Sequence, residues 1–490
     1  MNTKRENAEL KKTTWFENLR GTDCAVVGLG VSNLPLIEYL LDQGAHVTAR
    51  DRKSRDEIAK TADALERKGV RLRLGSGYLD DLNERVIFRS PGLRPDLPAF
   101  VSAVENGAIL TSEMELFFAL TPATVIGITG SDGKTTTTTL TGLFLEAECK
   151  RCGRGHVYVG GNIGAPLLPR VAQMTADDFA VVELSSFQLQ TMKCSPIYAA
   201  VTNLSPNHLN WHTDMDEYVR AKTNIFRHAQ NKLLVTNAEN AITADLAKAH
   251  GGRVTLFSSV RHGAYDFSFL LGDGDRAVYE RDGWICRWDG IRETPMLAVG
   301  EILLPGVHNL ENYMTAIALT DGLVSRESIG EVAKRFTGVR HRLERVRTFE
   351  GVTYYNSSID SSPTRTAAAL SALEQKPIVI CGGADKNLSF EPLADVLCRR
   401  AKAVILTGQT AEKIQRELSE RPEVQSGALP IWNDPDFEGA VRLARKIAVA
   451  GDTVLLSPAC TSFDAFRNFE ERGDVFCEIV RSFNFLSENF

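Results

Sequence analysis

The sequence contains no long hydrophobic run, and this absence excludes one class of protein at once. No apolar stretch approaches the ~18–20 residues that a helix needs to cross a bilayer. The basic residues near the N-terminus, such as Lys11 and Lys12, are followed by neither an apolar core nor a small-residue cleavage site. No signal peptide is therefore predicted, and we expect a cytoplasmic protein that does not act at a membrane.

An excess of positive charge is also absent. The chain has 56 Lys and Arg against 62 Asp and Glu, which gives a formal net charge of −6. Proteins that coat nucleic acid need a basic footprint to neutralise phosphates, so a nucleic-acid partner is not expected. A local basic pocket for a small anion is still compatible with this balance.

Cysteine is sparse, with nine residues spread over 490 positions. Most of them, including Cys24 and Cys381, lie in apolar runs, which indicates buried, reduced thiols. Cys149 and Cys152 form a lone C-x-x-C with His156 nearby. A structural zinc site needs four ligands, and no second pair stands at a suitable spacing. We therefore predict that this pair lies in a surface loop rather than at a metal or redox site.

The chain is rich in short β-branched runs that alternate with longer helical patterns, which is typical of an α/β fold with mainly parallel sheets. At roughly 100–200 residues per domain, 490 residues make about three domains. We predict domains at residues 1–120, 121–337 and 338–490. The segment 260–294 has alternating aromatics among Gly, Asp and Arg, and we predict a β-hairpin insertion there. Strands are expected at residues 25–27, 125–128, 180–184, 199–202, 232–236, 377–381, 403–407 and 453–456.

The strongest local signal is a Gly-x-x-Gly-Lys-Thr motif that follows an apolar strand and opens a helix. Its glycines let backbone N–H groups close around phosphate oxygens, and the helix N-terminus adds a partial positive charge. Lys134 can neutralise the β- and γ-phosphates, and the Thr135 hydroxyl can ligate Mg²⁺. The motif predicts a bound nucleotide but not the reaction. The expected contacts are Gly130, Ser131, Asp132, Gly133, Lys134, Thr135 and Thr136.

An earlier loop has part of a dinucleotide-binding pattern. The run Gly28-Leu29-Gly30-Val31-Ser32 ends a strand, and Asp51 follows the next strand about twenty residues on. Asn33 occupies the position of the third glycine. This departure favours a nucleotide sugar or another diphosphate over a redox cofactor, and a purely structural turn stays open.

Carboxylate and imidazole groups follow two further strands. Glu183 ends its strand beside the phosphate loop, where a second Mg²⁺ ligand belongs. His208 and His212 come after the next strand and could ligate a metal or orient a substrate, and we favour His208. Lys222 lies on a predicted helix with an apolar face, and the residues around it indicate only a solvated lysine.

In this order, these motifs resemble the ATP-dependent Mur ligases of peptidoglycan synthesis. The resemblance runs from about residue 22 to residue 480. The matches to the family's central domain are the phosphate loop, residues 160–164, 183–188 and 308–312, the His208 loop and Lys222. Residues 338–344 are similar to the start of the family's C-terminal domain. Residues 382–387, 456–464 and 468–473 are similar to the members that add D-glutamate.

The resemblance implies three domains with separate tasks. A Rossmann-like N-terminal domain would bind the uridine diphosphate of the substrate, and a central P-loop ATPase-like domain would bind ATP and Mg²⁺. A Rossmann-like C-terminal domain would close over ATP and bind D-glutamate. The carboxylate of UDP-N-acetylmuramoyl-L-alanine would attack ATP to form an acyl phosphate, which the amine of D-glutamate then captures. We expect a monomer that acts on these two small molecules.

The resemblance also assigns the site residues. Lys134, Glu183, His208 and Lys222 would be catalytic. Two Mg²⁺ ions are expected, one on Thr135 and Glu183 and the other on His208 and Lys222, which resembles the family's carbamylated lysine. Further ATP contacts would be Asn309, Asn312, Arg342 and Asp360. The UDP-substrate contacts would be Gly28, Leu29, Gly30, Val31, Ser32, Asp51 and Asn162, and the D-glutamate contacts Ser361, Lys386, Ser462, Phe463 and Phe469.

The chain departs from the family pattern at two places. The family's Asn-Asp-Ser has Ser357 in the Asp position, and a carboxylate stands three residues later at Asp360. Asn207 replaces the family's Asp before His208, which lowers the negative charge beside the metal. The alternatives are another Mur-type ligase with a different muramoyl substrate, a folylpolyglutamate synthase-like ligase, and a nucleotide-binding regulator without ligase activity. The diphosphate loop argues against a folate substrate, and the intact core residues argue against a regulator.

Overall fold

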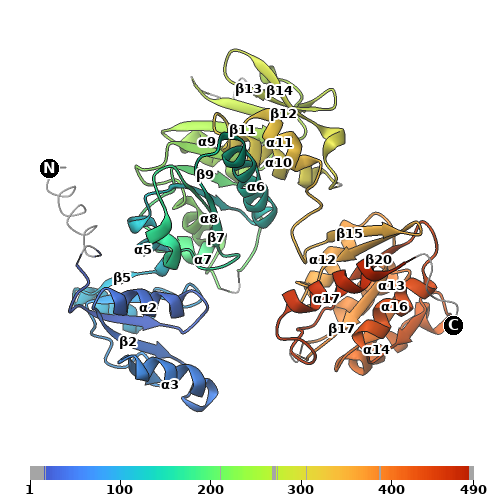
Figure 1. Ribbon diagram of the computed structural model, residues 1–490, viewed down its shortest axis with the longest axis horizontal. Helices are drawn as coiled ribbons and strands as arrows, with labels where there is room; N and C mark the ends of the chain where they lie inside the picture. Colours follow the sequence, from blue (N-terminus) through green and yellow to red (C-terminus); the bar gives the residue numbers. More distant parts are fainter. Residues whose placement is uncertain are drawn as a thin grey trace. The chain divides into compact units, whose positions relative to one another are not determined.

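The computed structural model describes residues 16, 18–209, 211–267, 272, 274–304, 306–385 and 388–484. Figure 1 shows the chain, which forms three β-sheets. It divides into two compact units, one up to Arg335 and one from Phe336. The first unit holds two of the sheets and the second unit holds the third.

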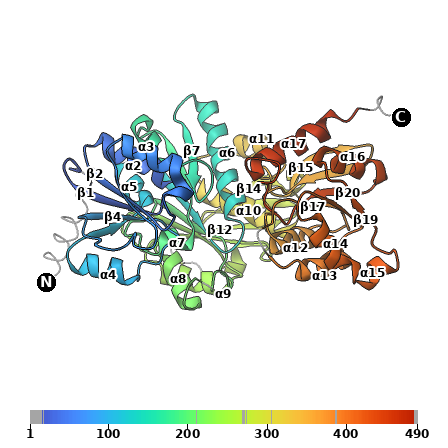
Figure 2. The same ribbon diagram turned by 90° about the horizontal axis from the view of Figure 1, so that it is seen from below.

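The first sheet has five parallel strands in the order β3-β2-β1-β4-β5. The helices of the β-α-β crossovers cover both faces, which is why β1 is apolar on both sides. Figure 2 shows α2 and α3 on one face of this sheet and α4 on the other. The strands are β1 (Asp23–Val27), β2 (His46–Asp51), β3 (Arg71–Leu74), β4 (Val86–Arg89) and β5 (Ile109–Thr111), and the helices are α2 (Asn33–Asp42), α3 (Ala59–Arg67), α4 (Pro98–Glu105) and α5 (Glu113–Leu120).

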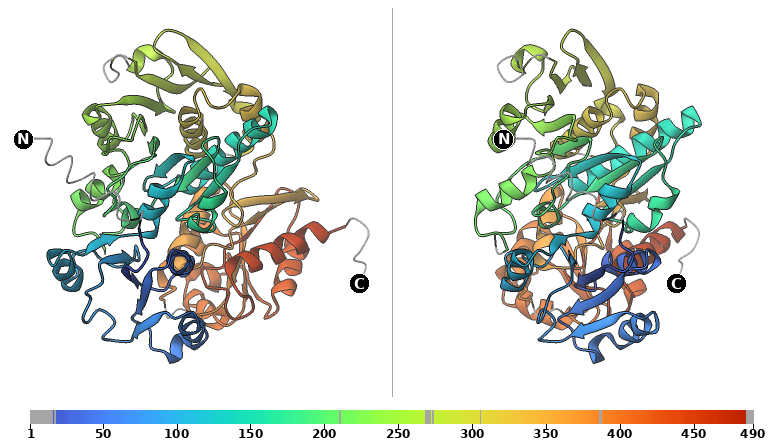
Figure 3. Two further views of the ribbon diagram at one scale, coloured as in Figure 1. Left: turned by 60° about the vertical axis from the view of Figure 1, so that its left-hand side comes forward. Right: turned by 90° about the vertical axis from the view of Figure 1, so that its left-hand side faces the viewer.

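The second sheet has nine strands in the order β14-β13-β12-β11-β10-β9-β6-β8-β7. Strands β6 to β12 run parallel, and β13 and β14 are antiparallel additions at one edge, drawn in yellow-green at the top of both views in Figure 3. The strands are β6 (Thr124–Thr129), β7 (Val157–Gly161), β8 (Phe179–Glu183), β9 (Tyr198–Val201), β10 (Leu233–Asn237), β11 (Arg253–Ser258), β12 (Arg276–Arg281), β13 (Trp284–Trp288) and β14 (Glu293–Ala298). The helices are α6 (Lys134–Cys152), α7 (Ser186–Leu189), α8 (Met215–Thr223), α9 (Ala241–Ala249), α10 (Val307–Leu319) and α11 (Arg326–Ala333).

The third sheet forms the second unit and has the order β15-β16-β20-β17-β18-β19. Only β15 is antiparallel to its neighbour. One buried cluster lies on each face, so the sheet is the middle layer of this unit. The strands are β15 (Glu344–Phe349), β16 (Val352–Asn356), β17 (Ile378–Gly382), β18 (Ala403–Thr407), β19 (Ile431–Asn433) and β20 (Thr453–Leu456), and the helices are α12 (Pro363–Ala372), α13 (Glu391–Arg400), α14 (Ala411–Ser419), α15 (Pro422–Gln425), α16 (Phe437–Ile447) and α17 (Phe469–Ser482).

The predicted strands are confirmed to within two residues at each end, and the predicted hairpin is present as β12 and β13. One prediction is wrong: Cys149 and Cys152 lie in the last turn of α6, not in a loop. The helix ends at Cys152 and is capped by Gly153, whose φ of +65° is a left-handed conformation that glycine adopts without strain. All nine cysteines are free thiols, and six of them are buried. Within the described ranges, no helix is long and apolar enough to span a bilayer.

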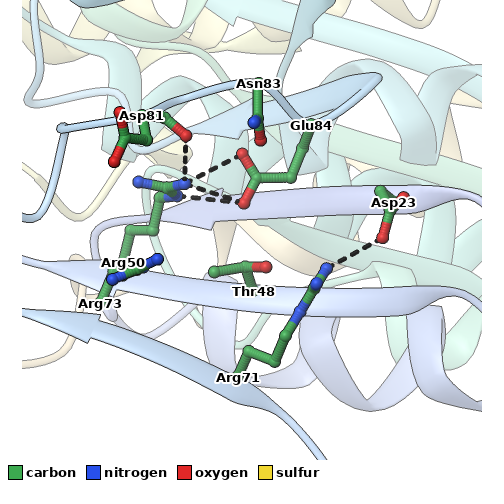
Figure 4. A pocket seen from close by; sticks show the side chains of 8 residues that line it. All are labelled: Asp23, Thr48, Arg50, Arg71, Arg73, Asp81, Asn83 and Glu84. Carbon is green, nitrogen blue, oxygen red and sulfur yellow. Dashed lines mark hydrogen bonds and ion pairs between the residues drawn. The ribbon is translucent and has the colours of Figure 1, made fainter.

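The connection between β3 and β4 contains no helix, and a buried ion pair fastens it to β2. The Arg50 guanidinium donates to the Glu84 carboxylate at 3.0 Å, and both side chains are nearly inaccessible to solvent. Its other N–H groups donate to the carbonyls of Tyr78, Asp80 and Asp81. Figure 4 shows this pair at one side of a 270 Å³ pocket. Because Arg50 bonds the Glu84 carboxylate and three backbone carbonyls, it fastens residues 78–84 to β2.

We expect Glu84→Gln to destabilise the first unit by about 3–5 kcal/mol, because it leaves the buried Arg50 charge without its counterion. Urea unfolding followed by circular dichroism should show an earlier first transition than in the wild-type protein. Glu66→Gln is the matched control, since Glu66 pairs with Arg55 at an exposed site, and its midpoint should stay nearly unchanged. Equal midpoints for the two variants would contradict a structural role of the buried pair.

Candidate active site

The phosphate loop joins β6 to α6 and is closed in by two neighbouring segments. Gly130 and Gly133 have φ values of +150° and +77°, which other residues rarely adopt. A Cβ atom on Gly130 would lie 1.8 Å from the Thr202 hydroxyl oxygen, and one on Gly133 would lie 2.4 Å from the Asn312 amide oxygen. Both glycines are therefore required by space as well as by conformation, which fits a loop whose backbone approaches phosphate closely.

Side chains from the loops after β9 and from α8 fix the shape of the phosphate loop. The Asp132 N–H donates to the Asn203 side chain at 3.0 Å, and the Thr202 hydroxyl donates to the Asp132 carbonyl at 2.6 Å. The Ser131 hydroxyl donates to the Ser205 carbonyl at 3.0 Å and lies 2.9 Å from the Tyr218 hydroxyl. The loop is therefore held in shape by its own protein surroundings.

Two lysine amines meet at the start of the loop. The Lys134 amine donates to the carbonyls of Gly130 (2.9 Å) and Ser131 (2.8 Å). The Lys222 amine, from α8, donates to the same Gly130 carbonyl at 2.8 Å and to the Thr129 hydroxyl at 2.9 Å. Lys222 is only 2% exposed. Burial and the nearby Lys134 charge hold its pKa well below the ordinary lysine value, so its neutral amine form is favoured. The structure thus corrects the simple reading of Lys222 as a solvated side chain.

Glu183 lies at the end of β8 and connects the phosphate loop to β7. One carboxylate oxygen accepts a hydrogen bond from the Thr135 hydroxyl at 2.8 Å, and the other accepts one from the Asn162 amide at 2.9 Å. Gly161 has no room for a side chain, because a Cβ atom there would lie 2.2 Å from the Glu183 carbonyl oxygen. Thr135, Glu183 and Asn162 therefore form a compact oxygen-rich group beside Lys134.

The two histidines after β9 have different environments. His208 is exposed, has a φ of +56°, and packs its ring edge-on against Phe187 at 4.9 Å. Desolvation and the Lys134 and Lys222 charges lower the pKa of His208, so its neutral form, the metal-binding one, prevails. His212 is buried, bonds the Ser186 hydroxyl at 2.9 Å and stacks on Phe187. His212 therefore packs inside the loop, while His208 is presented at its surface.

The first-sheet loop at residues 28–32 is shaped by two side chains. The Asp51 carboxylate accepts from the Leu29 N–H at 2.7 Å, and the Asn33 amide donates to the Gly28 carbonyl at 2.7 Å. Asn33 is buried, so the residue in the third glycine position fastens the loop instead of making space. Val31 at the tip of the loop is 79% exposed, and Gly30 and Ser32 lie on either side of it.

The predicted residues Asn309 and Asn312 lie on α10, which packs beside α6. The Asn312 carbonyl oxygen accepts from the Thr137 hydroxyl at 3.1 Å, and its amide lies 3.4 Å from the Asn309 side chain. Thr136 lies in the first turn of α6. This pair of helices therefore forms one wall of the phosphate loop.

In the second unit, the loops after β16 and β20 are joined by a buried arginine. Arg472 donates to the Ser358 hydroxyl at 3.0 Å and to the carbonyls of Cys460 and Thr461, each at 3.1 Å. The Ser358 hydroxyl in turn donates to the Phe469 carbonyl at 2.7 Å. These bonds bring together the segments that carry the predicted contacts Ser361, Ser462, Phe463 and Phe469. Lys386, also predicted there, lies outside the described residues.

Asp360 is buried between the same two loops. Its carboxylate accepts from the Ser457 hydroxyl at 2.8 Å, and its side chain is 6% exposed. Desolvation raises the pKa of Asp360 to about 6, and hydrogen bonds with Ser357 and Ser457 and the charge of Arg342 oppose that rise. The carboxylate is therefore held inside the unit by Ser457 and lies within the electrostatic reach of the predicted nucleotide contact Arg342.

The sequence analysis missed several residues that shape these sites. Arg472 and Ser457 lie in the motifs at residues 468–473 and 456–464. Only their three-dimensional contacts show that Arg472 bonds Ser358 and Cys460 and that Ser457 bonds Asp360. Tyr218 lies four residues before Lys222 on α8 and contacts the Lys222 amine with its ring at 5.0 Å. The spacing of four along a predicted helix was the available signal for that pair.

Family models cover most of the chain. A Mur ligase MurD-like N-terminal domain matches residues 22–112, a Mur ligase middle domain matches residues 128–320, and a Mur ligase glutamate ligase domain matches residues 341–460. Each of the three matches contains one of the three sheets or most of it. The three models thus follow the chain in the order of its sheets.

Curated relatives match almost from end to end. A UDP-N-acetylmuramoylalanine–D-glutamate ligase of Clostridium novyi is 46% identical over 96% of this chain and 100% of its own. The protein of the same name from Acetivibrio thermocellus is 43% identical over 96% of this chain and 99% of its own. Among solved structures, MurF from Acinetobacter baumannii is similar with a TM-score of 0.53, 17% identity, and coverage of 80% of this chain and 90% of its own. That likeness concerns the fold alone.

We expect the Asp360 carboxylate to make the stability of the second unit pH-dependent. Because its pKa rises from 3.8 to about 6 on folding, the native state binds the proton more tightly than the unfolded chain. The contribution of Asp360 to stability is therefore full below about pH 4, and about 3 kcal/mol of it is lost as the pH rises through 6. Asp360→Asn should remove this fall, as measured by urea unfolding at pH 4 to 7.5.

The matched control is Asp395→Asn on α13, since the Asp395 side chain is half exposed. That variant should keep the wild-type pH dependence. A pH dependence that survives Asp360→Asn unchanged would contradict the assignment of the buried carboxylate.

Proposed function

The chain belongs to the Mur ligase family, and we propose that it joins D-glutamate to UDP-N-acetylmuramoyl-L-alanine with ATP as the energy source. The observation that carries this function is the near-complete alignment with D-glutamate ligases at 43–46% identity. The geometry supports it, because Lys134, Thr135, Glu183 and Lys222 converge on one phosphate loop. The reaction is an ATP-dependent amide synthesis in the construction of peptidoglycan.

The chemistry explains why ATP is consumed. A carboxylate is a poor electrophile because oxide is a poor leaving group. The substrate carboxylate oxygen therefore attacks the γ-phosphorus of ATP, and ADP leaves. The D-glutamate amine next attacks the carbonyl carbon of the acyl phosphate, the ammonium proton is released, and inorganic phosphate leaves as the amide forms. Lys134 and the loop N–H groups stabilise the charge that develops on the transferred phosphoryl group.

The residues beside the phosphate loop fit Mg²⁺. The Thr135 hydroxyl and the Glu183 carboxylate already meet at 2.8 Å, and hard oxygen ligands are those that Mg²⁺ prefers. Mg²⁺ would supply charge neutralisation for the phosphates. We propose one ion on Thr135 and Glu183, and a second on His208 and a carbamylated Lys222.

The environment of Lys222 supports the carbamate. Only a neutral amine can attack carbon dioxide, and burial together with the Lys134 charge favours that form. The nitrogen forms a bond to the carbon of CO₂ and loses a proton, so a buried neutral amine becomes an anionic carbamate. An anion at this place would be stabilised by the Lys134 charge and would complete a metal site.

The remaining site residues are assigned by domain. We propose domains at residues 1–120, 121–337 and 338–490. The UDP part of the substrate would bind at residues 28–32 and Asp51, and its muramoyl part near Asn162. The proposed ATP contacts are residues 130–136, Asn309 and Asn312 in the central domain, and Arg342 and Asp360 in the C-terminal domain. D-Glutamate would contact Ser361, Lys386, Ser462, Phe463 and Phe469. We propose a cytoplasmic monomer.

The test of the function is phosphate release from ATP and Mg²⁺ in the presence of UDP-N-acetylmuramoyl-L-alanine, with D-glutamate, L-glutamate or no amino acid. We expect release only with D-glutamate, together with a product mass that has gained one glutamyl residue. Release with a folate substrate instead would favour a folylpolyglutamate synthase-like activity. ATP binding without release under any condition would favour a regulator and contradict the proposal.

We expect Lys222→Ala to lower kcat by about 100-fold or more, because it removes a metal ligand and the charge balance of the site. Short carboxylates such as acetate, which can occupy the space of the carbamate, should restore part of the activity. Lys248→Ala is the control, since Lys248 is an exposed residue of α9 that pairs with Asp245.

An independent measurement of the carbamate uses ¹³C NMR with labelled bicarbonate. A carbamate signal should appear in the wild-type protein and in Lys248→Ala but be absent from Lys222→Ala. Absence of this signal from the wild-type protein at neutral pH would contradict the assignment of a carbamate to Lys222, whatever the activity of the variant.

A further inference from the structure

Two arginines at the end of the first sheet contact the segments on both sides of His208. Arg89 is the last residue of β4, and Arg94 follows five residues later. Besides bonds within residues 89–96, both arginines bond partners 98 to 123 residues further along the chain, in or just after α7, in the His208 loop and in α8. All these residues belong to the first compact unit, so this is an interface within that unit.

Arg89 holds the residue that packs against His208. It is 1% exposed and donates to the Phe187 carbonyl at 3.2 Å and to the Thr191 hydroxyl at 3.1 Å. Burial lowers its pKa only to about 10, so it stays charged at neutral pH. The Phe187 ring lies 4.9 Å from the His208 ring, and Arg89 therefore positions one neighbour of the imidazole.

Arg94 holds the other side of the same loop. Its guanidinium donates to the Glu217 carboxylate at 2.9 Å and 3.3 Å, and to the Trp211 carbonyl. It also lies over the Trp211 ring at 5.2 Å, while the Trp211 indole N–H donates to the Gly92 carbonyl at 3.3 Å. Trp211 is three residues after His208, so Arg94 fixes the chain segment that follows His208.

Glu217 is the partner through which Arg94 reaches α8. Besides Arg94, its carboxylate accepts from the Thr213 N–H at 2.6 Å and the Gln190 amide at 2.9 Å. Desolvation acts to raise the pKa of Glu217, but Arg94 and the Thr213 N–H outweigh it and lower that pKa to about 2. Lys222 lies five residues after Glu217 on α8. One ion pair thus fastens both the His208 loop and the Lys222 helix to the first sheet.

The other end of the arginine segment touches the loop proposed to bind the diphosphate. The Ser90 N–H donates to the Val27 carbonyl at 2.9 Å. A Cβ atom on Gly28 would lie 2.7 Å from the Ser90 Cβ and 3.9 Å from Leu93. A packed chain of contacts therefore runs from Gly28 through residues 89–94 to Trp211.

We propose that Arg94 is a positioning residue that couples substrate binding at the first-sheet loop to divalent-cation binding at His208. The inference rests on the proposed function, which supplies the two ligands. A ligand that orders residues 28–32 also orders the adjoining Ser90 and Leu93, and through Arg94 the loop that presents His208. Because such coupling is reciprocal, the cation must tighten the substrate by the same factor.

The test measures Mn²⁺ binding to the full-length protein by electron paramagnetic resonance, with a non-hydrolysable ATP analogue present throughout. Titrations are run with and without UDP-N-acetylmuramoyl-L-alanine. We expect the substrate to tighten Mn²⁺ binding by about 5–50-fold in the wild-type protein. In Arg94→Ala this factor should fall to about one, while Mn²⁺ without substrate binds within about threefold of wild type.

Three further variants keep the test decisive. Glu217→Gln should lose the coupling in the same way, and the double variant should lose no more than either single one. Arg94→Lys keeps a charge that reaches Glu217 and serves if the alanine variant does not fold. Arg55→Ala is the control, because its ion pairs with Asp63 and Glu66 lie on the outside of the same sheet domain, and it should couple as wild type does.

The outcomes separate this inference from the function. Arg94→Ala with the wild-type factor, or a wild-type protein without coupling, would overturn the inference and leave the ligase reaction intact. Failure of the wild-type protein to bind UDP-N-acetylmuramoyl-L-alanine in calorimetry would overturn the function. In that case UDP alone is the ligand for the coupling titrations, which decide the role of Arg94 by the same comparison.

Discussion

The carbonyl oxygen of Gly130 accepts hydrogen bonds from two lysine amines, and much of the site depends on this one convergence. Lys134 approaches it at 2.9 Å and Lys222 at 2.8 Å. Two ammonium groups that share one acceptor repel each other, and burial makes the cost larger for Lys222. The region therefore favours anions and a neutral Lys222. Phosphates, the Glu183 carboxylate and a carbamate are all anions that the positive charge near this carbonyl would stabilise. The electrostatics of the loop therefore favour reactions of anionic groups there.

Much of the fold could be predicted from the sequence, because strands that are buried on both faces of a parallel sheet are continuous apolar runs. The phosphate loop could be predicted because its glycines, lysine and threonine stand at a fixed spacing along the chain. Glu183 could be predicted because it ends an apolar strand. Helix α6 shows the limit. It is buried over much of its length between the sheet, α10 and α11, so it lacks the amphipathic stripe that marks where a helix ends. Cys149 and Cys152 were therefore placed in a loop.

Contacts between distant segments could not be predicted in this way. Nothing in the spacing around Arg94 indicates Glu217 as its partner, because the two are 123 residues apart and meet only once both sheets have formed. The same holds for Asp360 and Ser457, which are 97 residues apart. The environment of Lys222 is a third case: the family resemblance marks this lysine, but no local pattern records its burial against the end of β6.

The Asn312 side chain lies against Gly133, so the phosphate loop is complete only when a late part of the chain has been synthesised. Thr137 and Asn312 are 175 residues apart, so a ribosome at about 5–20 residues per second needs roughly ten to thirty seconds to add the second after the first. During that interval the nascent chain already carries the whole Gly-x-x-Gly-Lys-Thr motif but has one open side. The phosphate loop thus gains its Asn312 wall late in translation, after the ninth strand of the central sheet has emerged and α10 has docked.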